Sequence, residues 1–361
     1  MSLIASTVIP SAAEDAFEID NSYLLEQATA SGTHVIAMGS SFGSGYSSTK
    51  DSRKKFTCAA WFKFTNTRHD DHYIELFHMT GSTSASLTIT TDYEDSTACQ
   101  ISWDVAGSDG DIKTAIIDTT GWFHVMIQVD TTNTDYGTSD PSTSAAARGR
   151  VKVWINGVHM QWDNHTGNHT ALPGYNHYVG GNQSTDFQDL LLGHWSAAQS
   201  NYVAEVHYLD NYLADATDFG KFNSDGIWIP IETSLTTANY GSAGAHLEFK
   251  QAGTSSNGQS SSGLGADTSG NNNHAYVYQN SLDANAPNSQ LTDTPTNNFN
   301  TINVLDTAQA NIDAGDDFVW TLGARKCTMG ADFGSYGKSR AQMAVSAGKW
   351  YFEVKITDAG S

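Results

Sequence analysis

The chain has 361 residues, of which 39% are hydrophobic, 11% aromatic and 16% charged. This length predicts two or three domains, and the aromatic content describes a packed protein and not a disordered one. A formal net charge of −21 argues against partners such as nucleic acid or anionic membranes, since both require a basic surface. Membrane insertion is not expected either, because no run approaches the roughly 18 apolar residues of a membrane helix.

Residues 1–21 are acidic and small, without a clear period. We interpret them as an anchoring arm that becomes ordered only against a neighbour. No Lys or Arg precedes Lys50, so this end lacks the positive region of a signal peptide. The surface composition is nevertheless typical of extracellular proteins. A particle that is released by cell lysis would explain this surface without a signal peptide.

Short alternating strands separated by turn residues recur from about residue 22 to residue 225, as in an all-β, two-sheet sandwich. One short helix is expected after Leu213, capped by Asp215 or Thr217. Cys58 lies in one of the strands as a small buried residue, and the three cysteines of the chain contain no C-x-x-C pair. The predicted strands are 23–27, 34–38, 56–64, 73–78, 86–90, 100–105, 113–118, 122–130, 150–156, 189–193 and 202–209.

The clearest period-two pattern lies in 122–130 and 150–156. Asn156-Gly157 predicts a tight hairpin turn after the second of these strands, because both residues accept positive φ. The residues expected on the buried face are Phe123, Val125, Ile127, Val129, Val151, Val153 and Ile155.

These strands and the closing segment 190–220 resemble laminin-G-like, concanavalin A-like domains. The resemblance implies an antiparallel jelly-roll sandwich over 22–225. It implies no single function, because this sandwich occurs in lectins, glycosidases, adhesion modules and viral appendages.

Four short segments resemble virion proteins of marine and other tailed phages. They are 202–210 ("YVAEVHYLD"), 218–220 ("DFG"), 227–230 ("IWIP") and 293–299. The resemblance implies a structural virion protein, above all a tail fibre or appendage that contributes to host attachment. Its arm would bind other tail proteins, its sandwiches would face the host, and three copies would close as a trimer.

Residues 226–302 are predicted to be a connector with short strands, Ser/Gly-rich at 253–265. Residues 303–361 are expected to begin a second sandwich, because 348–354, "GKWYFEV", resembles an early strand of SPRY-type domains. Such a domain needs many further strands, so we expect the chain to be a piece of a longer polypeptide.

No catalytic residues are predicted. A retaining glycosidase needs two carboxyl groups about 5–5.5 Å apart, and Glu75 and Glu205 each stand alone in their strands. An enzyme, including a glycoside hydrolase, is therefore disfavoured.

A loop after the hairpin mixes rings with amide and imidazole groups, which is how sugars are bound. The alternative is that Trp162 and Tyr178 pack beneath the loop. His165 and His169 have a zinc-type i, i+4 spacing, but their neighbours indicate a loop, so an exposed polar loop, a metal site and a role at a symmetry axis all stay open. The candidate ligand-binding residues, for a host surface glycan, are Trp162, Asn164, His165, His169, Tyr175 and His177.

The laminin-G resemblance also implies a structural calcium ion at the rim of the sandwich. Six acidic residues lie in or near turns there and could contribute, or could simply solvate the turns. Alternatives to the tail protein are a free carbohydrate-binding lectin or bacterial adhesin and a capsid-decorating protein. The six acidic residues are Asp92, Glu94, Asp95, Asp104, Asp109 and Asp111.

Overall fold

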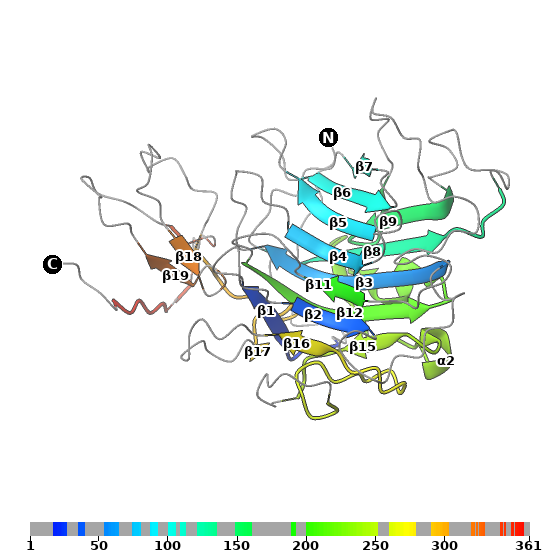
Figure 1. Cartoon of the computed structure of the whole chain (residues 1–361). Helices are drawn as coiled ribbons and strands as arrows, with labels where there is room; N and C mark the ends of the chain where they lie inside the picture. Colours follow the sequence, from blue (N-terminus) through cyan, green and yellow to red (C-terminus); the bar gives the residue numbers. More distant parts are fainter. Residues whose placement is uncertain are drawn as a thin grey trace.

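The computed structural model shows two antiparallel sheets packed face to face (Figure 1). No helix in the part of the chain that it describes is long and apolar enough to span a membrane. The described residues are 17–26, 35–39, 54–64, 74–80, 87–92, 100–105, 109–112, 121–135, 149–160, 189–192, 200–251, 260–278, 290–302, 319–321, 323, 325–328, 340–341, 343, 348–349 and 351–356.

The larger sheet has eight strands, and its neighbouring strands pair antiparallel. β15 lies beside β12 in addition to the main order of the sheet. That order is β10 (Val158–His159), β9 (Val151–Ile155), β8 (Phe123–Asp130), β3 (Lys55–Phe64), β12 (Ser200–Asp210), β1 (Ser22–Glu26) and β17 (Gln290–Leu291), with β15 at Ala245–Leu247.

The second sheet has seven strands, again paired antiparallel. Its order is β16 (Tyr276–Tyr278), β2 (Val35–Gly39), β11 (Asp189–Leu192), β4 (Ile74–Thr80), β5 (Leu87–Asp92), β6 (Gln100–Val105) and β7 (Asp109–Ile112).

The main hydrophobic core fills the space between the two sheets. Alternating residues of β8 and β9 supply one wall, as predicted from the period of two. Phe62 and Phe77 meet edge to face across the core at 5.6 Å between ring centroids, and Cys58 is a fully buried free cysteine. All seven residues predicted for the buried face belong to this core: Phe123, Val125, Ile127, Val129, Val151, Val153 and Ile155.

The antiparallel jelly-roll sandwich predicted from the sequence is therefore confirmed, and ten of the eleven predicted strands occur within two residues of their expected bounds. The eleventh, 113–118, lies outside the described residues. Asn156 and Gly157 have φ of 47° and 73° and join β9 to β10, as the hairpin prediction requires.

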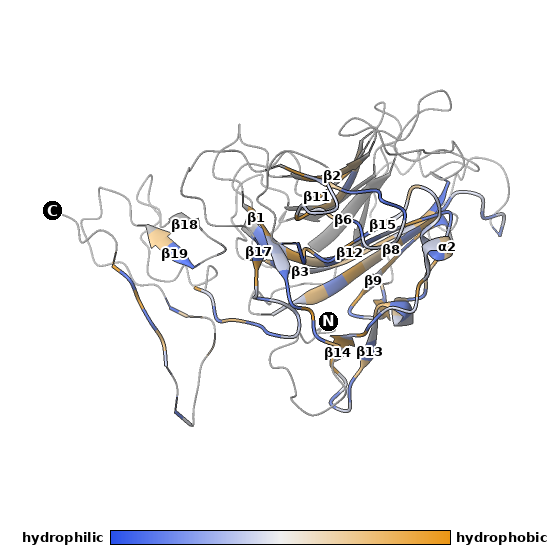
Figure 2. Ribbon diagram, turned by 90° about the horizontal axis from the view of Figure 1, so that it is seen from below, coloured by the Kyte–Doolittle hydropathy of each residue, from blue (hydrophilic) through white to orange (hydrophobic). Residues whose placement is uncertain are grey.

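A third layer covers the outer face of the eight-stranded sheet (Figure 2). It begins with the 3₁₀ helix η1 (Ala216–Asp218), where Asp215 is the N-cap and the Asp218 side chain accepts the Asp215 N–H. The hairpin of β13 (Gly220–Phe222) and β14 (Trp228–Pro230) and the helix α2 (Thr237–Tyr240) follow. A second hydrophobic cluster lies between this cover and the sheet.

The predicted connector 226–302 contributes strands to both sheets. β15 pairs with β12, β17 with β1, and β16 with β2 of the other sheet. The sandwich thus includes strands beyond residue 225, since β15, β16 and β17 pair within its two sheets. Of the predicted arm, the described residues begin at Phe17, and Ile19 is buried.

Few residues of the predicted SPRY-like segment 303–361 lie within the described part of the chain, so that prediction stays untested. β18 (Val319–Thr321) and β19 (Lys326–Thr328) form a two-stranded ribbon beside the main body (Figure 1). Residues 351–356 form no strand, and Tyr351 and Phe352 are 81% and 84% exposed. The alternating pattern there lacks a paired strand among the described residues, and a strand requires one.

Candidate functional site

A β-bulge interrupts β12 at the centre of the larger sheet. The pairing with β3 shifts register between Ala204 and His207, and Glu205 within the bulge has φ of 49°. Val203 and Val206 both face the inner core, although residues three apart would face opposite sides of a regular strand. The bulge therefore inserts one extra residue, Glu205, which lines a cavity on the outer face.

His207 and His246 are directly opposed on β12 and β15. Their rings stack at 4.1 Å between centroids, with an angle of 16° between the planes. Phe219 and Tyr240 from the third layer also contact the His207 ring, with centroids at 4.8 Å and 6.2 Å. The register of the sheet thus brings together two imidazoles that are far apart in sequence.

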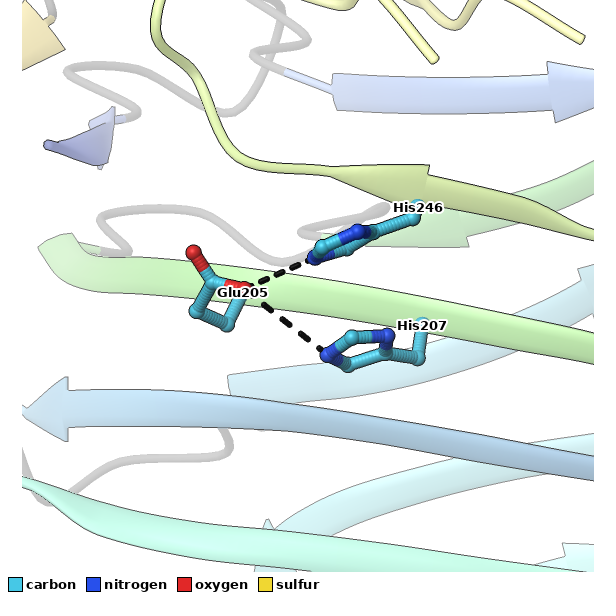
Figure 3. Close-up of side chains that lie close together, drawn as sticks. All are labelled: Glu205, His207 and His246. Carbon is cyan, nitrogen blue, oxygen red and sulfur yellow. Dashed lines mark hydrogen bonds and ion pairs between the residues drawn. The ribbon is translucent and has the colours of Figure 1, made fainter. Parts of the chain in front are cut away.

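The Glu205 carboxylate lies beside the stacked histidines, at the edge where their Nε2 atoms are (Figure 3). Its Oε2 atom is 2.7 Å from Nε2 of His246 and 3.9 Å from Nε2 of His207. The first contact is a hydrogen bond, and the second is too long to be one. All three side chains are buried, and one carboxylate and two ring nitrogens converge there.

The other nitrogen of each ring has a hydroxyl partner. Nδ1 of His207 lies 2.8 Å from the Tyr240 hydroxyl, and Nδ1 of His246 lies 3.1 Å from Oγ1 of Thr268. Thr268 also donates to the His246 carbonyl oxygen, at 3.3 Å. Asp267 accepts the His246 N–H at 2.9 Å. These contacts fix the ring orientations and leave both Nε2 atoms pointing at Glu205.

Burial lowers the pKa of His207 well below its ordinary value, and the neighbouring His246 and His124 act in the same direction. His207 is therefore a neutral imidazole near pH 7. Burial, followed by the charge of Glu205, raises the pKa of Tyr240, so its hydroxyl keeps its proton.

The cluster lines a cavity of about 440 Å³ between the sheet and the third layer. Glu232, Thr236 and Thr237 on its rim are exposed, so the cavity opens to solvent on that side. The lining combines rings and aliphatic groups with hydroxyl, carboxylate, imidazole and ammonium groups: Phe17, Trp61, Glu205, His207, Phe219, Pro230, Ile231, Glu232, Thr233, Leu235, Thr236, Thr237, Tyr240, His246, Glu248, Lys250, Thr268 and Ser269.

A second carboxylate, that of Glu248, lines the same cavity and forms an ion pair with Lys250. Burial alone would raise the pKa of Glu248, but the hydrogen bond from Lys250 and the nearby His246 outweigh it, and the net shift is downward. Both Glu205 and Glu248 thus face one cavity, although the sequence analysis found no second carboxylate beside Glu205 in its strand.

The ligand-binding residues predicted from the sequence, 162–177, lie outside the described residues. The same holds for Glu94 and Asp95 of the predicted calcium rim and for the side chains of the other four acidic residues. The loop and the calcium ion therefore stay predictions.

Sequence reasoning missed the cluster of Glu205, His207 and His246. The E-x-H spacing of Glu205 and His207 was a signal, since residues two apart share one face of a strand. His246 lies in a second predicted strand, but its pairing opposite His207 depends on the tertiary fold.

No family model matches the chain, and no curated protein matches it. Among solved structures it is similar to a heptameric SAP-like pentraxin from Limulus polyphemus, with 12% identity over 55% of this chain and 80% of that one and a TM-score of 0.34. It is also similar to domains LG4-5 of the mouse laminin alpha1 chain, with 10% identity over 64% of this chain and 48% of that one and a TM-score of 0.30.

A third similar structure is the CBM40 of the Ruminococcus gnavus IT-sialidase, with 10% identity over 55% of this chain and 96% of that one and a TM-score of 0.31. The class of this protein, an antiparallel jelly-roll sandwich, follows from the strand pairing described above.

Proposed function

We propose that this chain is a carbohydrate-binding module and that the cavity beside Glu205, His207 and His246 receives a sugar unit. The observation that carries the proposal is the composition of the cavity, where rings and aliphatic groups stand next to many hydrogen-bonding groups. Its volume of about 440 Å³ falls within the roughly 300–1,000 Å³ of small-molecule sites.

A sugar offers an apolar ring face and a set of hydroxyl groups. The hydroxyl oxygens of Thr237 and Thr268, whose protons are donated to backbone carbonyls, and the carboxylate of Glu248 supply acceptors for the hydroxyl groups of such a ligand. Phe17 and Leu235, both half-buried, supply apolar contacts at the mouth. We propose binding without turnover.

The test is a glycan array followed by calorimetry on the full chain. Glu248→Gln, which keeps the shape of the cavity, should weaken binding at least about tenfold, since a hydrogen bond to a charged group contributes about 1.5–3 kcal/mol. Trp162→Ala with Tyr175→Ala is the matched variant for the loop predicted from the sequence, and it should leave binding unchanged.

Loss of binding in the loop variant alone would move the sugar site to that loop. Absence of binding to every glycan on the array would overturn the proposal. Chromatography of the glycan after incubation would reveal shortened products if the protein were a glycosidase.

A second proposal concerns the biological setting, a tail fibre or appendage of a phage virion. The observation in its favour is that the phage-like segments surround the cavity: Glu205 and His207 come from 202–210, Phe219 from 218–220, and Pro230 from 227–230. Adhesion to host glycans would suit such an appendage, with the arm at 1–21 on other tail proteins and three copies in a trimer. Immunogold electron microscopy should label the tail; label on the capsid or on the host cell alone would contradict it.

A further inference from the structure

We propose that Glu205, His207 and His246 form a binding site for one divalent transition-metal ion, with Zn²⁺ as the reference ion. The site goes beyond the sugar proposal, because metal binding can be measured without any glycan. It also differs from the calcium predicted at the rim, since calcium prefers oxygen ligands, whereas two of these three ligand atoms are imidazole nitrogens.

The first support is convergence. One atom from each side chain, Nε2 of each histidine and a carboxylate oxygen, lies within 4.8 Å of the other two. Zinc binds histidine nitrogen and carboxylate oxygen at about 2.0–2.2 Å. To bind an ion, the carboxylate would turn away from its hydrogen bond with His246, and the two stacked rings, now 16° apart in plane, would tilt so that both Nε2 lone pairs meet at one point.

The second support is the outer shell of the cluster. Metal-bound histidines use their second nitrogen in a hydrogen bond that fixes the ring. Tyr240 and Thr268 provide such partners at Nδ1 of His207 and His246. In the metal-bound state Nε2 of His246 would give up the proton that it shares with Glu205, and a proton on Nδ1, donated to Oγ1 of Thr268, would leave the Nε2 lone pair to the ion.

The third support is that the backbone and the contacts of the cluster are energetically unfavourable. Glu205 adopts a positive φ, which is unfavourable for a residue with a side chain, and Nε2 of His207 faces the carboxylate at 3.9 Å without a hydrogen bond. A role in packing alone would be served by apolar side chains at a regular strand position. Strained backbone of this kind is concentrated at functional sites.

Two histidines and one carboxylate leave coordination positions open. Catalytic and ligand-binding metal sites have this arrangement, whereas structural zinc sites have four protein ligands. The open side faces the cavity, so a water molecule or a donor atom of a cavity ligand would complete the coordination.

The experiment is calorimetric titration of Zn²⁺ into the full chain after treatment with a chelator, with the bound metal counted by mass spectrometry. The expected result is one tightly bound ion in the wild type. His246→Gln and Glu205→Gln should weaken binding by more than the roughly 100-fold that loss of an outer hydrogen-bond partner costs at most.

Two control variants separate this site from other histidines. His159→Gln changes an exposed histidine of β10, and His165→Gln with His169→Gln changes the loop spacing noted in the sequence. Both should leave the tight site intact. A wild type that binds no Zn²⁺, or cluster variants with wild-type affinity, would overturn the proposal.

Tyr240→Phe and Thr268→Val test the positioning residues. Each should weaken Zn²⁺ binding by about 10–100-fold, and the melting temperature without metal should fall moderately, because each removes a hydroxyl partner of a buried ring nitrogen. If the cluster variants fail to fold, X-ray absorption of the Zn²⁺-loaded wild type decides instead: two imidazoles in the first shell support the site, and fewer than two overturn it. Glycan binding measured with and without Zn²⁺ keeps this result distinct from the sugar proposal.

Discussion

Lys63 of β3 and Asp293, 230 residues later, form an ion pair at 2.8 Å with side-chain exposures of 0% and 4%. The Lys63 ammonium also donates to Oδ1 of Asn298 and to the Phe299 carbonyl, each at 2.7 Å. The indole of Trp122 donates to Asp293 at 3.0 Å. The phage-like segment 293–299 of the predicted connector is therefore anchored to β3, in the middle of the eight-stranded sheet.

Asp293→Ala should lower the free energy of unfolding by about 3–5 kcal/mol, because it leaves the Lys63 charge buried without its partner. Chemical denaturation followed by tryptophan fluorescence measures the change. The control is Lys250→Ala at the half-exposed pair with Glu248, which should cost about 1 kcal/mol or less. Equal effects of the two substitutions would show that the buried pair is not important for stability.

Gly220→Ala should destabilise the protein by about 1–3 kcal/mol through overpacking. A Cβ atom there would lie 2.4 Å from the Trp228 ring, and that ring fills the cluster beneath the third layer. Combination with Trp228→Leu should cost less than the sum of the single changes, since the two sites are in contact. Gly226→Ala is the control for backbone strain alone, because its φ is 76° and nothing lies within 4 Å. If the two substitutions changed the free energy of unfolding additively, the contact between residue 220 and the Trp228 ring would be contradicted.

Stability should fall with acid because of His124. Burial lowers the pKa of His124 from 6.5 to about 3, and neither ring nitrogen has a hydrogen-bond partner among the described residues. His124 therefore binds a proton below about pH 6.5 in the unfolded chain, but only below about pH 3 in the folded protein. This contribution to stability is complete above pH 6.5 and declines by about 1.4 kcal/mol for each pH unit below it.

The measurement for His124 is denaturation at a series of pH values between 4 and 8. His124→Phe should reduce the slope between pH 6.5 and 4, and His207, whose pKa is lowered in the same direction, accounts for part of the remaining slope. An unchanged slope in the variant would show that His124 is not buried in the neutral form.

Glu205→Gly and Glu205→Ala both remove the carboxylate but differ in backbone freedom. Because φ at this position is 49°, the glycine variant should be more stable than the alanine variant, by up to about 1.6 kcal/mol. The left-handed conformation costs alanine ~1–2 kcal/mol, and the extra entropy of glycine in the unfolded chain offsets ~0.4–1 kcal/mol of that difference. Thermal unfolding of the two variants measures it, and a more stable alanine variant would argue against the bulge.

The sequence predicted the sandwich because its evidence is local. Alternation over 122–130 and 150–156 determines which side chains face the core, and Asn156-Gly157 determines the turn between β9 and β10. Each of these features acts within a few residues, so neighbouring strands could be recognised without knowledge of their partners.

The site could not be predicted in the same way. It depends on a bulge at Glu205, on the opposition of His207 and His246 across two strands, and on Thr268 from a later loop. The three-residue strands β15 and β16 carry too little pattern to reveal their partners, so 226–302 was interpreted as a connector.

A crystal structure of the protein with a glycan selected on the array would test the sugar site most directly. We predict density for a sugar unit in the cavity of the eight-stranded sheet, within hydrogen-bond distance of Glu248 and next to the Glu205, His207 and His246 cluster. Density for the glycan at residues 162–177, with an empty cavity, would contradict the assignment of the site.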